Sequence, residues 1–516
     1  MSRMPSPKVT NHNHPSGPPK TGGRGVAMVQ WLAAVLLAVS VAKFGNPVIL
    51  EVNEDSWDIW KLLFFSWPVE WGIVTSGAFL ILGLSLFGKW KPRIRDPLFL
   101  LVSGWLVWQF ASAVQTDDTG LTWRTLPHLA VCLGWFHLGY VVLSGCRSIK
   151  PVWIGMFCGS LVVLAFSVEQ HFHGIRQSRQ FFYRQLKWRQ YSPEFLKHLT
   201  SKTIPDSLVN QVRESSKPPA EFLRLVADKP LPEEIWQRIA EDHGMPGEFM
   251  KKINSNRIWG TMVYPNTLAG VLLLLTPFLS VFLWKNAQGF TLGARFLLVA
   301  IYMGTALACL IWSGSKSGWL IALAMGGAAF LTVPLDRRIR LSVGGLVLIL
   351  GVAVFFARYG DFFHKGATSV GARLGYWESA IHTARNQPFF GSGPGTFSRT
   401  YADYKQDDWE MARLTHNDYL EQASDSGWPG FALFCTFFLL AFHRIFRCRK
   451  LFEDPFLVAL VLSVSGWAIH SLVEFGLYIP ALAWPAYFIF GWISGRAREY
   501  NLEAQRQKPP PDLQKS

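Results

Sequence analysis

Charged residues are scarce in this sequence. Only 16% of its 516 residues are Asp, Glu, Lys or Arg, whereas a soluble protein usually carries about 25%. The apolar residues gather in runs of roughly 17–23, each long enough as a helix to cross about 30 Å of hydrocarbon. The shortage of charge therefore excludes an ordinary soluble protein and predicts an all-α polytopic membrane protein.

We expect about twelve transmembrane helices from these runs. A polar lead of about 25 residues precedes the first run and no clear small-x-small cleavage site follows it, so we interpret that run as a retained anchor. The predicted spans cover approximately residues 27–45, 67–87, 97–114, 125–145, 152–168, 262–284, 296–312, 317–333, 341–357, 428–446, 455–473 and 478–494.

Cysteine is rare as well. None of the six cysteines lies in a predicted outer loop, where oxidising conditions would favour a disulfide. They fall within predicted spans or at predicted cytoplasmic ends: Cys132, Cys146, Cys158, Cys309, Cys435 and Cys448. We therefore expect no structural disulfide.

Lysine and arginine are distributed unevenly between the two sides of the predicted spans. The connecting segments of one parity hold about fifteen of them, and the short loops of the other parity hold about three. The positive-inside rule then places both termini in the cytoplasm and two long segments, 169–261 and 358–427, outside. The net charge of +15 thus reflects membrane anchoring and does not indicate nucleic-acid binding. The outer short loops are relatively acidic, with Glu51, Glu54, Asp55, Asp58, Asp117, Asp118 and Glu474.

This topology divides the chain into seven parts. The first and last are cytoplasmic tails, and we expect the N-terminal 24 residues and the final stretch KPPPDLQKS, which are polar and Pro-rich, to be disordered. The parts are residues 1–25 (tail), 26–168 (spans one to five), 169–261 (periplasmic insertion), 262–357 (spans six to nine), 358–427 (periplasmic catalytic loop), 428–495 (spans ten to twelve) and 496–516 (tail).

Ionisable side chains are nearly absent from the predicted spans. The exceptions are His128, His137 and His470, and a lone span histidine more often forms a helix–helix hydrogen bond than a ligand site. A transporter should instead place ionisable groups along its path. The informative polar residues lie at the outer ends of spans, which indicates a site at the outer membrane surface.

Two of these outer-end stretches carry one cation each before a span. In Asn256–Gly270, Arg257 stands at the outer boundary; it is a candidate anion ligand, and a snorkelling anchor is the alternative. In Trp312–Leu320, a turn too short to hide Lys316 places that charge beside the first NH groups of the next span, which could hold an anion. The alternative there is a Gly/Ser turn with an interfacial lysine.

A third stretch, Gly371–Phe397, predicts an amphipathic helix. Arg373 and Trp377 recur at helical spacing, and Pro388 disfavours helix at the residue before it, so the helix should end near Asn386. The GSGPG turn that follows could present backbone NH groups to phosphate at its glycines, Gly393 and Gly395. A bare Gly-rich turn is a weak signal, and a plain turn is the alternative.

The fourth stretch is THNDYLEQASDSGWPG, Thr415–Gly430, in which His416, Asn417 and Asp418 are adjacent. A Thr with an Asp three residues later resembles a capping box, which predicts a helix starting there. His416 would then lie in the first helical turn, whose unpaired NH groups attract anions. The alternative is a polar cap at the membrane boundary.

Together the four stretches would bring cations to one place beside the bilayer. Such a cluster suits an anionic lipid headgroup, and nearby carboxylates make transfer chemistry plausible. The cations are Arg257, Lys316, Arg373 and His416, and the carboxylates are Glu378, Asp418 and Glu421.

These residues resemble the signature of the bacterial O-antigen ligase and polymerase superfamily. The pattern His-Asn-x-x-Leu, six residues, then Gly is met by His416, Asn417, Leu420 and Gly427. Upstream stand an Arg–Gly-Thr–Pro-Asn-x-Leu-Ala-Gly element that begins at Arg257, and an Arg–Trp helix followed by Pro-Phe-Phe-Gly-x-Gly-Pro-Gly-Thr-Phe. The motifs cover about 257–430, and the twelve-span layout extends the likeness to most of the chain.

The resemblance implies a membrane-embedded (GT-C-like), metal-independent glycosyltransferase without a cofactor, in the bacterial inner membrane. Such enzymes take a glycan from an undecaprenyl-diphosphate carrier on the periplasmic side. The acceptor is lipid A core for a ligase, another carrier-linked chain for a polymerase, or a protein hydroxyl for an O-oligosaccharyltransferase. A flippase for lipid-linked sugars is the main alternative of another class, and a non-catalytic assembly component is a third.

The resemblance also implies roles for individual residues. Arg257 and Arg373 would bind the diphosphate leaving group, and His416 would orient or deprotonate the acceptor hydroxyl or bind phosphate itself. The remaining candidates for substrate binding are Lys316, Asn417, Asp418, Trp377, Gly393 and Gly395. No metal ligand is implied.

The sequence departs from the family pattern in three places. The turn that commonly carries Ser-Arg reads Ser315-Lys316, which keeps the charge and loses the bidentate fork. Trp428 replaces the usual aliphatic residue after Gly427. The 169–261 segment is long and opens with a basic, aromatic run, Arg176–Tyr191, that suits either a helix lying on an anionic surface or a solvated basic helix; the rest reads as short helices joined by Pro turns.

The topology makes a direct prediction. Reporter fusions at about residues 220 and 400 should both report the periplasm, because both lie in segments that the charge asymmetry places outside. Alkaline phosphatase and fluorescent-protein fusions at these two points provide the measurement. A cytoplasmic signal at either point would contradict the topology.

Overall fold

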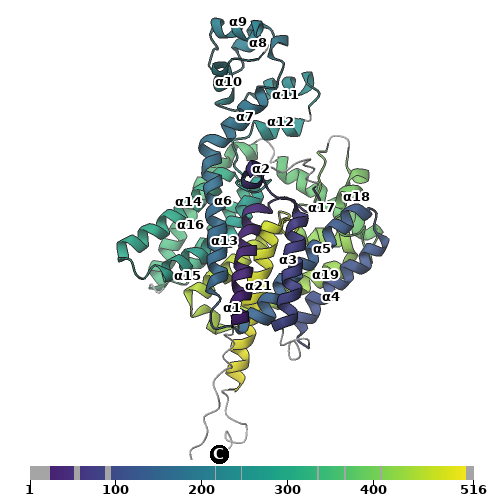
Figure 1. Cartoon of the computed structure of the whole chain (residues 1–516), viewed down its shortest axis with the longest axis vertical. Coiled ribbons are helices and arrows are strands. Elements are labelled where there is room, and N and C mark those ends of the chain that lie inside the picture. Colours follow the sequence, from purple (N-terminus) through teal and green to yellow (C-terminus); the bar gives the residue numbers. More distant parts are fainter. Residues whose placement is uncertain are drawn as a thin grey trace, which may run out of the picture.

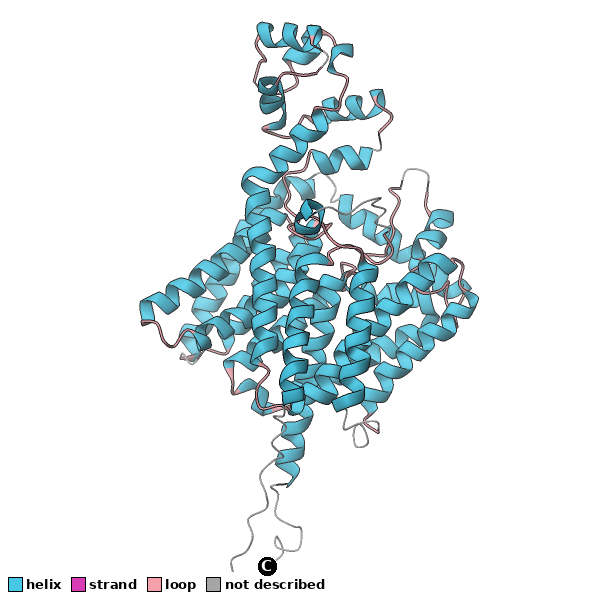
Figure 2. Ribbon diagram, viewed as in Figure 1, coloured by secondary structure: helices cyan, strands magenta, loops and turns pink. Residues whose placement is uncertain are grey.

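The computed structural model describes residues 24–50, 59–87, 95–333 apart from 201, 216 and 246, then 336–364, 368–406 and 409–506; these residues form helices and no strand (Figures 1 and 2). The acidic residues of segment 51–58 and most of the basic segment Lys89–Arg95 lie outside this set. Six helices precede the insertion (residues 169–261): α1 (Arg24–Lys43), α2 (Ile59–Phe64), α3 (Val69–Phe87), α4 (Pro97–Ser112), α5 (Thr119–His137) and α6 (Lys150–Glu169).

The later helices complete the bundle. Short helices make up the insertion, and long ones follow it. They are α7 (Ile175–Tyr183), α8 (Pro193–Lys197), α9 (Asp206–Glu214), α10 (Ala220–Ala227), α11 (Glu233–Asp242), α12 (Gly247–Ile253), α13 (Pro265–Asn286), α14 (Leu292–Ser313), α15 (Lys316–Leu331), α16 (Arg337–His364), α17 (Thr368–Asn386), α18 (Phe397–Tyr404), α19 (Asp418–Arg447), α20 (Pro455–His470) and α21 (Pro480–Arg506).

Helix α21 runs through the centre of the bundle (Figure 1). Its residues from Pro480 to Gly495 are buried on every side. It crosses the end of α5 closely, since a Cβ on Gly491 would lie 2.1 Å from the Phe136 carbonyl oxygen and one on Gly139 would lie 2.6 Å from that of Phe488. Only glycine lets two helix backbones approach this far, which is a common way to pack helices in a membrane.

The helices agree with a multi-pass membrane protein. Eight of them are long and apolar enough to cross a bilayer by length and composition, and three shorter apolar helices, which include α15 and α20, accompany them. Helix α21, although central, is not among these, so the count of twelve spans stays a prediction. The eight are Arg24–Lys43, Pro97–Gln115, Thr119–Gly145, Lys150–Tyr183, Pro265–Asn286, Leu292–Ser313, Arg337–Gly360 and Asp418–Arg447.

Several predicted boundaries can be compared with the helices. Helix α17 ends at Asn386, as Pro388 led us to expect. The tenth span was predicted to begin at 428, but helix α19 begins ten residues earlier and is kinked at Ser426 and Gly427, where Gly427 adopts φ 67°. The hydrophobic run thus marks the part of α19 after the kink, and the polar residues before it are also helical.

The insertion is a small helical unit with its own core, and this corrects our reading of its basic run. Helix α7 continues from α6 through a π-helical turn instead of lying flat on a surface (Figure 1). The aromatic residues Tyr183, Trp188 and Tyr191 are buried among α8 to α12. The Pro turns were predicted correctly, because α9, α10 and α11 each begin directly after a proline.

Two of the three span histidines form the expected hydrogen bonds between helices. The His128 ring contacts the Leu477 carbonyl oxygen at 2.7 Å and accepts from the Trp484 indole at 3.1 Å. His137 Nε2 lies 3.1 Å from the Ser103 hydroxyl. His470 is buried, and neither of its ring nitrogens has a partner within the described residues.

Candidate functional site

The four predicted cations come from separate segments, and three of them connect through one carboxylate. Glu474 lies in the turn after α20 and forms an ion pair with Arg373 of α17. Its other oxygen lies 3.0 Å from His416 Nδ1. The Asn266 amide at the start of α13 donates to Glu474 at 2.6 Å and accepts from the Arg257 guanidinium at 2.7 Å. Residues up to 217 positions apart are thereby held in one network.

Glu474 is charged although its side chain is only 5% exposed. Burial alone would raise its pKa, but the charge and hydrogen bond of His416 and the charge of Arg373 outweigh burial and lower the pKa to about 2. A buried carboxylate without such partners would cost several kcal/mol. The network therefore depends on both cations being present.

Arg257 is fixed by its own set of contacts. Its Nε donates to the Ser313 carbonyl oxygen at 2.7 Å. Gly314 adopts φ 62° beside it, and a Cβ there would lie 3.1 Å from Arg257 Nε, so glycine at this turn leaves room for the guanidinium. Burial lowers the pKa of Arg257 from its ordinary value, and the nearby Glu474 opposes this.

The insertion is tied to the site through Arg179 of α7. This side chain is 1% exposed. It donates to the carbonyl oxygens of Ile253 at 3.1 Å and Ser255 at 3.0 Å, and it also contacts the Asn256 side chain. These residues immediately precede Arg257, so the insertion fixes the chain from which that cation projects.

His416 lies before α19 and not in its first turn, which corrects the capping-box prediction. The N-cap is Asn417, whose side chain accepts from the NH groups of Tyr419 at 3.0 Å and Leu420 at 3.1 Å. His416 has φ 52°, the only positive value for a non-glycine residue in the described chain. A non-glycine residue in this uncommon backbone conformation is kept there by the surrounding structure, and such residues cluster at functional sites.

The His416 ring is held on three sides. Its centroid lies 5.8 Å from the Tyr376 ring in a nearly parallel arrangement and 4.6 Å from the Phe475 ring edge-on. Nδ1 faces Glu474, and the ring has no other hydrogen-bond partner within the part of the chain that is described. Nε2 is therefore the nitrogen left for a ligand.

Asn417 and Asp418 support the site without lining its cavity. Asp418 is 1% exposed. Its carboxylate accepts from the Leu477 NH at 2.9 Å, and its own NH donates to the Ser471 carbonyl oxygen at 2.8 Å. These bonds dock the start of α19 on the turn that carries Glu474, so Asp418 acts as a positioning residue.

The Gly-rich turn binds a carboxylate of this chain. The NH of Gly393 donates to the Asp425 carbonyl oxygen at 2.9 Å, and the NH of Gly395 donates to the Asp425 side chain at 2.6 Å. A Cβ on Gly393 would lie 2.2 Å from the Thr116 hydroxyl. The predicted phosphate-binding NH groups are thus engaged inside the fold, where they hold the turn against the kink of α19. Trp377 packs in a small core beside α18.

A cavity of about 510 Å³ lies next to the network and is called the cation cavity below. Arg257, Tyr376 and His416 line it, with Arg413 at its edge. Lys316 does not line it; its ammonium lies 5.3 Å from the Tyr359 ring, within electrostatic range of Arg257 and Arg373. Among the described residues, no group of three His, Cys, Asp or Glu side chains could hold a metal ion.

Sequence reasoning missed Glu474 as the centre of the site. It was noted only as one acidic residue of an outer loop, and Asn266 only as part of a motif. The sequence did contain an indication of its role. A single carboxylate in a loop of about four residues between two apolar spans is expected to be buried, and a buried charge is normally paired with a cation.

Glu474→Gln should destabilise the protein in a pH-dependent way. Lowering the pKa from 4.5 to about 2 corresponds to about 3 kcal/mol. Because the folded-state pKa is the lower one, this stability is complete above the unfolded-state pKa and disappears as the pH falls from about 4.5 toward 2. Melting curves of purified protein should show a gap between wild type and variant at pH 6–8 that narrows below pH 4.5. Glu453→Gln, at an exposed position, should show no gap, and a gap for Glu474→Gln that is unchanged at pH 3 would refute the assignment.

The comparison with known families finds a match over part of the chain. Residues 301–435, from α14 into α19, match the family described as O-antigen ligase. The matched range contains Lys316, Arg373 and His416, whereas Arg257 and Glu474 flank it on either side. No curated protein matches the chain. The match covers about a quarter of the chain and supports a relationship to the O-antigen ligase superfamily, which is a family of cell-envelope polysaccharide assembly.

Proposed function

We propose that this protein transfers a glycan from an undecaprenyl-diphosphate carrier to an acceptor hydroxyl at the periplasmic face of the bacterial inner membrane, as an O-antigen ligase does. The observation that carries the proposal is the Glu474-centred network, which fixes two arginines and a histidine beside one cavity. The insertion and the cation cavity would face the periplasm, and both termini the cytoplasm.

The two arginines suit a diphosphate leaving group. Arg373 is held by the Val473 carbonyl oxygen at 3.1 Å as well as by Glu474, and Arg257 by Ser313 and Asn266. With Lys316 nearby and His416 neutral, three positive charges and the Glu474 carboxylate leave a net local charge of about +2, opposite in sign to that of a diphosphate. Donors that need no rearrangement stabilise charge that develops in the transition state.

His416 in its neutral form, without the charge that it carries when protonated beside Glu474, suits the role of general base. Glu474 holds Nδ1, so that Nε2 can accept the proton of the acceptor hydroxyl, in the same way as a carboxylate orients a catalytic histidine in other transferases and hydrolases. The acceptor oxygen then forms a bond to the anomeric carbon while the bond from that carbon to the diphosphate oxygen breaks. The diphosphate leaves as an anion beside Arg257 and Arg373. The competing role, direct binding of phosphate by His416, would not need the bond to Glu474.

An apolar cavity suits the polyprenyl tail of the carrier. It has a volume of about 420 Å³ and lies between α13, α14, α15 and α20. The first three of these helices carry Asn266, Ser313 and Lys316 at the ends where the cations gather. At 1.5 Å per residue, the cavity begins about one to two helical turns below those ends. A lipid with its headgroup on the cations would therefore reach it with its tail.

Other members of the same superfamily remain alternatives. A polymerase and a protein O-oligosaccharyltransferase would use the same donor site and differ in the acceptor. A flippase would need ionisable groups along an open path, whereas the buried carboxylates Asp418 and Asp425 are bonded to backbone NH groups. The network therefore favours transfer chemistry over transport.

His416→Ala and Arg373→Ala should each reduce glycan transfer by about a hundredfold or more, because each removes a group that acts on the transition state. The assay is transfer from a carrier-linked glycan in proteoliposomes. Matched controls lie on α17: His382→Ala and Arg385→Ala, at positions outside the network, should retain activity. Full transfer by folded His416→Ala or Arg373→Ala would contradict an enzymatic role.

Gly326→Phe should raise KM for the donor, because Gly326 lines the apolar cavity and the ring would fill space that the tail needs. The effect should be large for a donor with a full-length polyprenyl tail and small for one with a tail of two isoprene units. Gly304→Phe is the matched control, since a Cβ at either glycine meets nothing within 4 Å and Gly304 lies outside the cavity lining. Equal KM values for both tail lengths in Gly326→Phe would rule out this tail site.

A further inference from the structure

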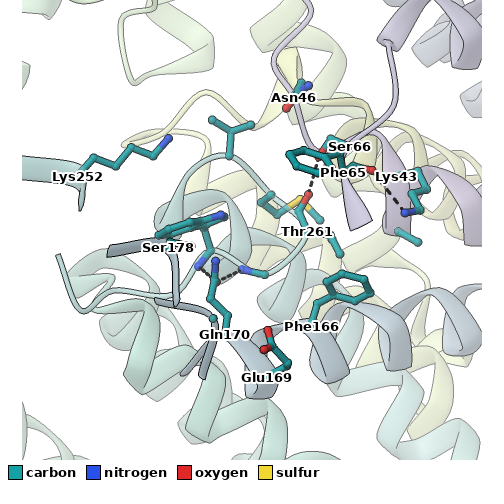
Figure 3. Close-up of a pocket in the computed structure, with 16 residues that line it drawn as sticks. Lys43, Asn46, Phe65, Ser66, Phe166, Glu169, Gln170, Ser178, Lys252 and Thr261 are labelled. Carbon is teal, nitrogen blue, oxygen red and sulfur yellow. Dashed lines mark hydrogen bonds between the residues drawn. The ribbon is translucent and has the colours of Figure 1, made fainter. Parts of the chain in front are cut away.

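A second, polar cavity lies beside the cation cavity (Figure 3). Its volume is about 450 Å³, and the two cavities share Lys252, Trp259 and Val263 in their linings. The remaining walls come from the end of α1 and Asn46 beyond it, from residues 65–66, and from the end of α6 with the π-helical turn and α7 that follow it. The segment that begins with Arg257 thus contributes to both cavities, so a ligand in the second would lie next to the reacting groups in the first.

This cavity is lined by polar groups that the fold does not use. Asn46 is only 8% exposed, and its amide has no hydrogen-bond partner within the described residues. The Thr261 hydroxyl oxygen is buried and also lacks a partner there. Glu169 is exposed, and its carboxylate forms neither a hydrogen bond nor an ion pair with any described residue; Figure 3 shows it among the side chains that line the cavity. Buried polar groups are normally satisfied, so the unpartnered Thr261 hydroxyl marks room for a polar ligand. The Asn46 amide and the exposed Glu169 carboxylate line the same space and leave hydrogen-bonding groups for that ligand.

The other lining groups restrict the chemistry of that ligand. Lys43 donates to the Leu63 carbonyl oxygen at 2.5 Å, and Lys252 lies 5.8 Å from the Trp259 ring. With Glu169, the cavity has two ammonium groups and one carboxylate, so it is not a strong anion site. Phe166 and Trp259 add aromatic faces.

Each of these groups has a counterpart on a sugar. A carboxylate accepts from two neighbouring hydroxyls, an amide both donates and accepts, and an ammonium donates to hydroxyl oxygens. Aromatic rings pack against the apolar faces of the ligand. A volume of several hundred Å³ with a few convergent polar groups is typical of small-molecule sites.

We propose that the second cavity binds an uncharged sugar unit, and that Glu169 and Asn46 are its main hydrogen-bonding residues. The proposal rests on the proposed function, since the sugar belongs either to the acceptor or to the glycan of the donor. Both sources present the same hydroxyl chemistry to the cavity, and kinetics separates them.

Binding can be measured without any transfer reaction. Lactose serves as a neutral disaccharide probe, and saturation-transfer-difference NMR on the full chain in nanodiscs reports its contact with the protein. Wild type should give a signal that falls at least severalfold in Glu169→Gln and in Asn46→Ala. Glu234→Gln, at an exposed glutamate of α11, is the matched control and should keep the wild-type signal. Equal signals in all four proteins, each with a wild-type melting curve, would overturn the proposal.

Kinetics then identifies the source of the sugar. Loss of a hydrogen bond to a charged group costs about tenfold or more in binding, so Glu169→Gln should raise one KM by about tenfold with kcat nearly unchanged. A raised KM for the acceptor, with unchanged release of glycan to water, assigns the acceptor sugar; a raised KM for the donor assigns the donor glycan. Wild-type values for both KM and kcat would overturn the proposal. A wild-type protein that binds lactose and transfers no glycan would instead refute the proposed function and leave the sugar site standing.

Discussion

The buried charge of Glu474 is the interaction on which the site depends. A carboxylate taken out of water needs compensating cations, and here it receives Arg373, His416 and, through Asn266, Arg257. Removing any of these partners leaves an uncompensated charge in the interior, which is costly. The need to neutralise one carboxylate therefore fixes the relative positions of groups that come from four segments of the chain.

The surrounding fold reinforces this network from several directions. Asp418 bonds the start of α19 to the turn of Glu474, and Arg179 bonds the insertion to the residues before Arg257. The NH groups of the Gly-rich turn donate hydrogen bonds to Asp425, and these bonds hold the end of α17 against the kink of α19. Each support uses hydrogen bonds of buried side chains, which hold the connected segments in fixed relative positions. A rigid set of cations is what electrostatic stabilisation of a leaving group requires.

The three cavities match the parts of an amphiphilic, glycan-bearing substrate. The cation cavity lies at the start of α13, the apolar cavity lies between α13, α14, α15 and α20, and the polar cavity lies beside the Arg257 segment. In the proposed reaction they would take the diphosphate, the polyprenyl tail and a sugar unit, respectively. The His416 ring, held between Tyr376 and Phe475, lines the cation cavity, which shares part of its wall with the polar cavity.

Hydropathy runs, Pro positions and short motifs are local properties, so they were sufficient to predict the helical, multi-pass class and most helix positions, and to nominate the cations of the candidate site. These local patterns pointed to His416, Arg373 and Arg257, but they placed His416 inside a helical turn, whereas it lies before the helix. They also predicted that Gly393 and Gly395 bind phosphate, whereas the NH groups of both residues bond to Asp425. Only the tertiary structure decided that Glu474 joins the cations, that α7 rises from α6, and that the insertion steadies Arg257. The physical reason is distance along the chain: a buried carboxylate can be paired by any cation that folding brings near it, and nothing local to residue 474 specifies partners 58 and 101 positions away.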